Sequence, residues 1–131
     1  MVVFGGFEQG VRTNKTIVYD FLTKTWSEVE YDTKGVAPVP RAGHSAVVHR
    51  DGMFVFGGKD DENEKLKDLW RLDLEHNSWT RLDSPDSAVA PRSGHSCCVY
   101  GDHLLIFGGI QEITKELDDC LVYHIIEEKW L

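Results

Sequence analysis

Cysteine is scarce in this chain of 131 residues, which contains only three, and two of them, Cys97 and Cys98, are adjacent. Neighbouring residues of an extended strand point to opposite faces, so a disulfide framework is not expected. No apolar run approaches the ~20 residues of a membrane-spanning helix. The first residues also lack the charged region and apolar stretch of a signal peptide. These absences predict a cytoplasmic protein without membrane spans.

Positive charge is outnumbered, because 14 lysines and arginines stand against 22 aspartates and glutamates and give a net charge of −8. Such a chain repels nucleic acid phosphates and anionic lipid. Hydrophobic residues make up 41% of the chain and charged residues 27%, which is typical of a folded globular domain. We therefore expect a protein or peptide partner and no nucleic acid or membrane partner.

A repeat of about fifty residues organises the chain. A short apolar run ends in two glycines at three places: Gly5 and Gly6, Gly57 and Gly58, Gly108 and Gly109. A tryptophan follows each glycine pair, at Trp26, Trp79 and Trp130. The sequence Pro-Arg-x-Gly-His-Ser occurs at residues 40–45 and again at residues 91–96. The landmarks keep one order throughout, so each repeat is expected to form the same structural unit.

Local patterns within one repeat predict four strands. Residues 45–49 alternate in polarity, Asp51 and Gly52 favour a tight turn, and residues 53–56 form an apolar run, which together indicate a hairpin. The third repeat carries its turn at Gly101 and Asp102. A fourth strand is expected to begin at Trp79, after a turn over residues 75–77.

Residues 64–75 are rich in helix formers and therefore have an alternative helical interpretation. However, Trp70, Leu72 and Leu74 recur at every second position, which is the period of a strand. The equivalent segments 16–19 and 120–123 contain β-branched and aromatic residues that suit strands. The third element of the repeat is therefore predicted to be a strand.

These motifs resemble the kelch repeat, which implies one four-stranded antiparallel blade of a β-propeller per repeat. The fold expected is all-β, an arc of an incomplete propeller over residues 1–131. Residues 1–39 would form a blade that lacks its first strand, residues 40–90 a complete blade, and residues 91–131 a blade that lacks most of its fourth strand. Because the outer faces of such an arc are uncovered, the isolated chain is expected to self-associate.

The resemblance also implies structural roles for the repeated motif residues, which are expected to pack within the blades. They are Gly5, Gly6, Gly57, Gly58, Gly108, Gly109, Tyr19, Tyr123, Trp26, Trp79, Trp130, His44 and His95. The two histidines are expected to form hydrogen bonds within their own blades.

Two groups of charged residues are candidates for partner binding. Arg41 and Arg92 recur in the Pro-Arg motif, and in kelch propellers arginines at this place sometimes bind acidic peptides. Internal ion pairs explain their recurrence equally well. The predicted loop 59–67 carries four acids, Asp60, Asp61, Glu62 and Glu64, and lies on the face opposite to the tight turns. Loops on a rigid scaffold commonly carry binding residues, although a solvated loop tip has the same composition.

The function expected is a non-catalytic kelch-repeat module for protein–protein interaction, an adaptor or scaffold without a cofactor. The alternative is a piece of a kelch-type enzyme or metal-dependent specifier protein whose active site lies in blades outside this chain. Kelch-type nitrile specifiers hold iron through a Glu-x3-Asp-x3-His pattern, and here Glu64 and Asp68 are followed by Leu72, so the third ligand is missing. No catalytic or metal-binding residue is predicted.

Overall fold

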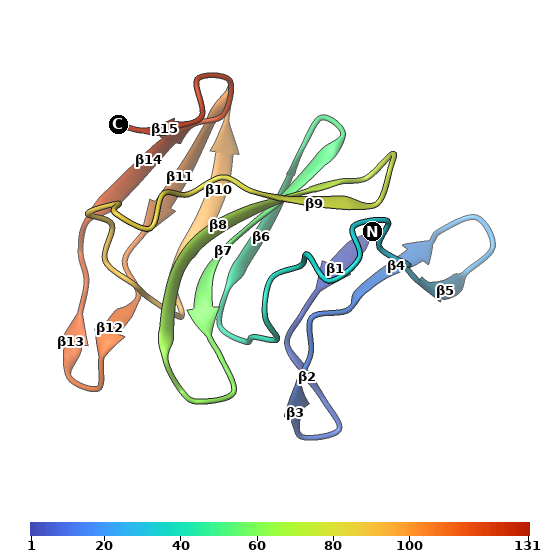
Figure 1. The fold of residues 1–131 in the computed structure, drawn as a ribbon, viewed down its shortest axis with the longest axis horizontal. Coiled ribbons are helices and arrows are strands. Elements are labelled where there is room, and N and C mark those ends of the chain that lie inside the picture. Colours follow the sequence, from blue (N-terminus) through green and yellow to red (C-terminus); the bar gives the residue numbers. More distant parts are fainter.

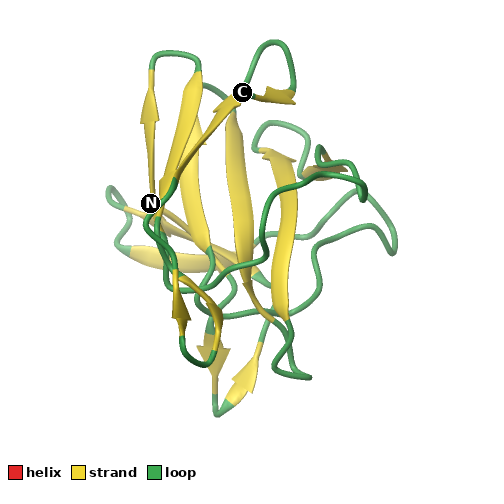
Figure 2. Ribbon diagram, turned by 90° about the vertical axis from the view of Figure 1, so that its left-hand side faces the viewer, coloured by secondary structure: helices red, strands yellow, loops and turns green.

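Strands and connecting loops form the whole molecule, and the computed structural model describes every residue from Met1 to Leu131. It contains no helix, so no helix long and apolar enough to cross a membrane is present (Figure 2). The third repeat element, for which a helix was the alternative, is the strand β8 (Lys65–Asp73). The prediction of an all-β fold is confirmed.

Three antiparallel sheets stand side by side in an arc, and we call them the first, second and third blades (Figure 1). The first blade consists of β1 (Val2–Phe4), β4 (Thr16–Asp20) and β5 (Thr25–Glu28). The second consists of β6 (Ser45–His49), β7 (Gly52–Lys59), β8 and β9 (Ser78–Arg81). The third consists of β10 (Ser96–Tyr100), β11 (His103–Phe107), β14 (Cys120–His124) and β15 (Lys129–Trp130). Two small hairpins, β2 (Phe7–Glu8) with β3 (Val11–Arg12) and β12 (Ile110–Glu112) with β13 (Lys115–Glu116), project from the first and third blades.

The predicted turn at Asp51 and Gly52 is wrong by one residue. His49 pairs with Gly52, so the loop consists of Arg50 and Asp51, and Arg50 takes a positive φ of 53°. Gly52 lies inside the sheet, beneath the Arg71 side chain. A Cβ added to this residue would come within 2.5 Å of Arg71 Nε. The glycine therefore allows the Arg71 side chain to approach the backbone closely and is not part of the turn.

The turn of the third blade follows the prediction. Tyr100 pairs with His103, which leaves Gly101 and Asp102 as the two-residue loop. The inner hairpins of the two blades also share their register, because Ser45 pairs with Phe56 and Ser96 pairs with Phe107. The repeat in sequence is thus a repeat in strand pairing, and positions in one blade can be compared with positions in the next.

The core lies between the blades, in two clusters of buried side chains. The first cluster joins the first and second blades and comprises Phe4, Met53, Val55, Trp70, Leu72 and Trp79. The second joins the second and third blades and comprises Phe54, Phe56, Leu69, Leu104, Ile106 and Tyr123. Strand β7 sends alternate side chains into the two clusters, which is the period-two geometry of a strand buried on both faces. We call the two inter-blade contacts the first and second seams.

The motif residues of the two outer faces are exposed. Trp26 of the first blade is 54% exposed and Phe107 of the third blade is 55% exposed. Their counterparts Trp79 and Phe56 are 3% and 1% exposed because each packs against the neighbouring blade. Within residues 1–131 both end faces therefore present apolar surface, and self-association stays a prediction that this exposure supports.

Candidate functional site

The Arg41 guanidinium is wholly buried and holds the start of the second blade in place. It donates two hydrogen bonds to the Asp68 carboxylate, at 2.6 and 2.8 Å, and others to the carbonyls of Gly57 and Val39. Burial alone would raise the pKa of Asp68, but the hydrogen bonds and charge of Arg41 outweigh it and hold that pKa below its usual value. All these groups belong to the second blade or to the segment that enters it.

Arg92 repeats this arrangement in the third blade. It is also wholly buried, and it donates to both carboxylate oxygens of Asp119, at 2.6 and 2.9 Å, and to the carbonyls of Gly108 and Ala90. Of the two roles open for Arg41 and Arg92, the structure thus favours the internal ion pair. The interpretation of Arg41 and Arg92 as partner-binding residues is therefore corrected. Both guanidinium groups are already bonded to carboxylates within the chain, so neither is available to bind a ligand.

The two motif histidines bond across the seams, so the prediction that each bonds within its own blade is wrong. His44 Nε2 lies 2.7 Å from the carbonyl oxygen of Phe4 in the first blade. His95 Nε2 lies 2.8 Å from Ser45 Oγ in the second blade. Burial, with a smaller contribution from the Arg92 charge, lowers the pKa of His95 to about 4, so the ring is neutral at pH 7. Each histidine therefore ties its blade to the preceding one.

The glycine pair of the second blade makes room for atoms that approach it closely. Gly57 and Gly58 take positive φ values of 64° and 101°. A Cβ on Gly57 would lie 2.8 Å from the Arg92 carbonyl oxygen, and one on Gly58 would lie 2.9 Å from the Ala42 carbonyl oxygen. These close contacts support the structural role predicted for this pair, past which strand β7 continues to Lys59 through a bulge.

Three hairpin tips share one end of the molecule and form the surface that we call the three-hairpin face (Figure 1). It consists of residues 7–12, 60–64 and 110–116. The tight turns at residues 50–51 and 101–102 lie at the opposite end. The connector 83–90 runs along the outer edge of the blades, where the Ser87 carbonyl accepts a hydrogen bond from Lys67 Nζ.

The side chain of Asp60, the first acidic residue of the central tip, fixes the conformation of this loop. Asp60 Oδ1 accepts hydrogen bonds from the backbone N–H groups of Glu62 and Glu64, at 3.0 and 2.9 Å. Arg12 of the neighbouring hairpin donates to Asn63 Oδ1 at 3.3 Å. Asp60 is therefore engaged within the loop, in an arrangement typical of Asp in turns.

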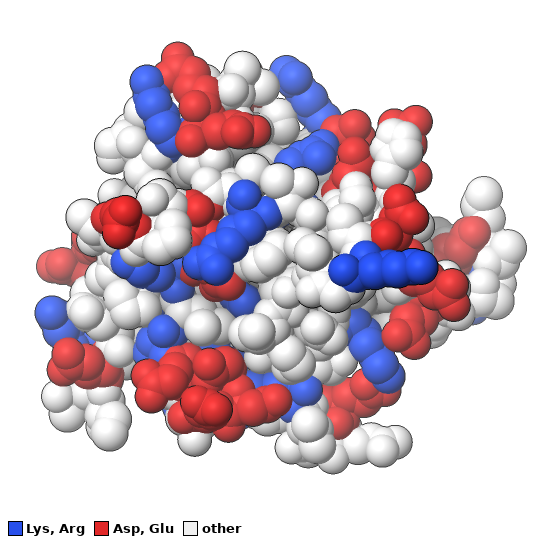
Figure 3. All heavy atoms as spheres, in the orientation of Figure 1, with Lys and Arg blue, Asp and Glu red and all other residues white.

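The other three acids of the loop, Asp61, Glu62 and Glu64, are exposed. Figure 3 shows acidic side chains gathered at this tip, with uncharged surface at the tips of the two small hairpins beside it. The structure thus brings three of the four predicted acidic residues to one exposed surface and assigns the fourth to the support of the loop.

A cleft of about 490 Å³ separates this acidic tip from the β12–β13 hairpin. Glu64 and Glu112 supply carboxylates to its walls and Lys65 supplies one base, while Ile113, which is 99% exposed, and Pro91 supply apolar surface. Nothing in the sequence repeat predicted the β12–β13 hairpin or this cleft. The signal available was the apolar Ile113 between polar neighbours at the tip of a short loop. Carboxylates beside apolar surface suit a ligand that is both basic and apolar.

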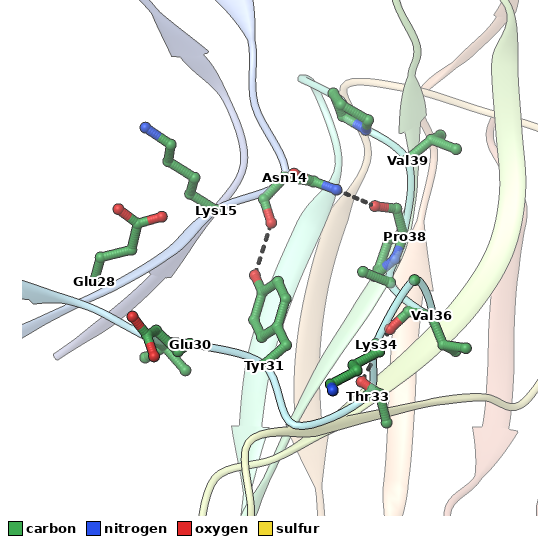
Figure 4. Close-up of a pocket in the computed structure, with 14 residues that line it drawn as sticks. Asn14, Lys15, Glu28, Glu30, Tyr31, Thr33, Lys34, Val36, Pro38 and Val39 are labelled. Carbon is green, nitrogen blue, oxygen red and sulfur yellow. Dashed lines mark hydrogen bonds between the residues drawn. The ribbon is translucent and has the colours of Figure 1, made fainter.

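The largest hollow of the molecule, about 590 Å³, lies beside the connector 29–40 (Figure 4). Its polar groups bond to one another, because the Tyr31 hydroxyl donates to the Asn14 carbonyl at 2.7 Å and Asn14 Nδ2 donates to the Pro38 carbonyl at 3.1 Å. Burial raises the pKa of Tyr31, so its hydroxyl keeps its proton. These contacts fix the connector and leave no buried polar group directed at a ligand.

No group of three or more His, Cys, Asp or Glu side chains has a geometry that could hold a metal ion. Asp68, the middle residue of the segment compared with the Glu-x3-Asp-x3-His iron pattern, forms an ion pair with Arg41. Burial raises the pKa of the Cys97 thiol to about 11, so this thiol stays protonated at neutral pH.

Sequence reasoning missed the acid partners of the two arginines. Asp68 follows Arg41, and Asp119 follows Arg92, at the same separation of 27 residues. A charge of opposite sign at a fixed distance in both repeats was a signal for an internal pair.

Comparison with known proteins identifies one family over the full length. The family model described as the KLHDC2/KLHL20/DRC7 Kelch-repeats domain matches residues 1–131. Host cell factor 2 of Homo sapiens is 43% identical over 83 residues, which cover 59% of this chain and 10% of that protein. Alpha-scruin of Limulus polyphemus is 29% identical over 140 residues, 98% of this chain and 14% of that protein. Host cell factor of Drosophila melanogaster is 34% identical over 148 residues, all of this chain and 10% of that protein. The chain thus spans only 10–14% of the length of these relatives.

Proposed function

This chain belongs to the kelch-repeat family, and from that premise we propose that it is a protein-binding module which uses the three-hairpin face to hold a basic segment of a partner protein. In this proposal the blades act as a rigid, non-catalytic scaffold and the chain serves as an adaptor. The partner carries lysine or arginine beside an apolar residue.

The observation that carries the proposal is the exposed acidic tip next to the cleft. Asp61, Glu62 and Glu64 form no ion pair with the chain's own lysines or arginines. A basic partner therefore meets carboxylates that are not already neutralised. The net charge of −8 further favours association with a cationic segment. Apolar surface at Ile113 adds a contact that salt does not screen.

The test is to neutralise these three acids together, in the variant Asp61→Asn, Glu62→Gln, Glu64→Gln, and to measure binding of a short peptide of alternating lysine and serine with one leucine. The association rate is expected to fall about tenfold at low salt, because charge steering is lost. The difference between variant and native chain should shrink as salt rises. Stopped-flow or surface-based kinetics at several salt concentrations gives both quantities.

A matched control removes the same charge elsewhere, through Glu28→Gln, Glu30→Gln and Glu75→Gln, three exposed acids outside the three-hairpin face. This control should keep most of the association rate. Equal losses in both variants would show that net charge alone attracts the peptide, and the proposal would be wrong. Asp60 stays unchanged in every variant, because its loss would alter the loop itself.

A further inference from the structure

The first seam is closed along its outer edge by the connector 29–40. The Asp32 backbone N–H donates to the Asn77 carbonyl at 2.9 Å, and the Trp79 N–H donates to Thr33 Oγ1 at 3.1 Å. The ring of Tyr31 packs edge-on against the indole of Trp79, with 5.6 Å between centroids. A short extended segment with one aromatic side chain thus covers the outer strand of the second blade.

The second seam has no such closure. Ser84 occupies the position of Tyr31, since each stands five residues after the tryptophan of its blade. The connector 83–90 bonds back to its own blade, where Asp83 Oδ1 accepts the Leu69 N–H at 3.1 Å and the Ser87 carbonyl accepts Lys67 Nζ at 2.7 Å. A hollow of about 420 Å³ remains between this connector and the strands β14 and β15, and we call it the seam pocket.

Two buried polar groups in the wall of the seam pocket lack a hydrogen-bond partner. They are the hydroxyl of Tyr123, a residue that is 1% exposed, and the indole Nε1 of Trp130. The indole Nε1 of Trp79 in the first seam is unpaired as well, so the Tyr123 hydroxyl is the group that distinguishes the second seam. Buried polar groups are rarely left unpaired, because each costs about 1 to 3 kcal/mol. The Tyr123 hydroxyl keeps its proton, since burial and nearby carboxylates raise its pKa to about 12. The pocket therefore offers donors to an uncharged acceptor.

The backbone of β15 repeats the edge that the first connector uses. Leu131 N–H donates to the Val122 carbonyl, so the N–H of the preceding residue, Trp130, points away from the sheet. This group is the counterpart of the Trp79 N–H that Thr33 accepts in the first seam. Glu128 likewise matches Asn77, and both have a positive φ, of 51° and 55°. The backbone edge of β15 is therefore available for hydrogen bonds, but the second seam contains no segment that pairs with it.

From this comparison we infer that the seam pocket binds an extended segment of a partner protein that carries a tyrosine side chain. Its ring packs against Trp130 as Tyr31 packs against Trp79, and its backbone bonds to the edge of β15. A hydroxyl-bearing residue two positions later corresponds to Thr33. This site lies on the outer edge of the blades and is independent of the three-hairpin face.

The charges around the pocket select the unmodified tyrosine. Asp86 and Glu128 line it, and Lys129, the one base in its wall, is paired with Glu127. A phosphorylated tyrosine carries close to two negative charges and would meet these acids without a free base. The ligand class is therefore an extended peptide with a neutral phenol.

The chain itself supplies the probe, a peptide with the sequence of residues 29–35, Val-Glu-Tyr-Asp-Thr-Lys-Gly. Titration of the 131-residue chain, followed by NMR of the Trp130 indole N–H, is expected to give a saturable shift. The same peptide with serine or phosphotyrosine in place of tyrosine should bind at least about tenfold more weakly. Tyr123→Phe, which removes only a hydroxyl, should weaken binding about fivefold. Shifts of equal size and affinity with the serine peptide, or no shift with the tyrosine peptide, would overturn the inference.

Two further variants test the comparison between seams. Ser84→Tyr is expected to fill the pocket with the chain's own side chain and abolish the Trp130 shift. Tyr31→Ser opens the first seam, so a second shift should appear at the Trp79 indole. If this variant fails to fold, Ser84→Tyr alone decides, because unchanged binding in it contradicts the proposed location. The triple variant of Asp61, Glu62 and Glu64 should bind the peptide normally, which separates this site from the proposed acidic face.

Discussion

The second blade and its two neighbours carry the same motif but bury it to very different extents. In the second blade Phe56 and Trp79 are 1% and 3% exposed. The equivalent Phe107 of the third blade and Trp26 of the first are 55% and 54% exposed. The difference arises because the motif aromatics pack between blades, and only the second blade has a neighbour on both sides. A motif residue in this fold is thus stabilised by the adjacent repeat more than by its own.

The strongest test of this comparison substitutes the tryptophans. Trp79→Ala is expected to lower the free energy of unfolding by about 3 to 5 kcal/mol, because a buried aromatic side chain is removed from the first cluster. Trp26→Ala should cost about 1 kcal/mol or less, since its ring is half exposed. Denaturant unfolding of both variants measures the difference. Equal losses would mean that the tryptophan acts within its own blade.

The buried ion pairs give a smaller contrast. Arg41→Met leaves the Asp68 carboxylate, whose side chain is 13% exposed, without its charged partner and with only the Trp70 indole N–H as a donor, and should cost about 3 kcal/mol. Arg92→Met leaves Asp119, whose side chain is 46% exposed and reaches water, so about 1 kcal/mol is expected. Asp119→Asn and Asp68→Asn are the matched variants from the acid side. If the two arginine variants lose equal stability, exposure of the acid does not decide the cost.

A further test varies the pH and concerns the second seam. His95 has a pKa of about 4 in the folded chain, whereas an unfolded histidine has a pKa near 6.5. The unfolded state therefore binds the proton first, so this contribution to stability is fully present well above pH 6.5 and falls by about 2 kcal/mol by pH 5. His95→Gln should flatten this part of the profile, while His76→Gln, a change at an exposed histidine, should not. Unfolding free energies measured across this range provide the check.

Much of the fold could be predicted from the sequence because each strand shows its own local pattern. The period of two at Trp70, Leu72 and Leu74 outweighed the helix propensity of the same segment, and that segment is β8. The offset turn at Arg50 and Asp51 was missed because an Asp-Gly pair is a strong local turn signal. In this chain the glycine instead makes room for an arginine that approaches from another strand.

The candidate sites were harder to predict, since they depend on contacts between repeats. A repeat pattern shows that His44 and His95 are equivalent but does not show which neighbour they reach. Both bond across a seam, at a distance of about one repeat in sequence. The seam pocket was equally hidden, because it results from a serine at a position where the preceding connector has Tyr31.

The Asp60 hydrogen bonds have a further consequence for how the acidic tip could change over evolution. Because the loop is ordered by its first residue, its conformational entropy is already lost when the chain folds, and a partner does not have to order it again. Asp61, Glu62 and Glu64 are then free to vary in side chain without altering the path of the backbone, whereas Asn63 is constrained by its positive φ of 62°. Specificity at this tip can therefore change by single substitutions, while Asp60 and the blades beneath it maintain the backbone conformation of the loop.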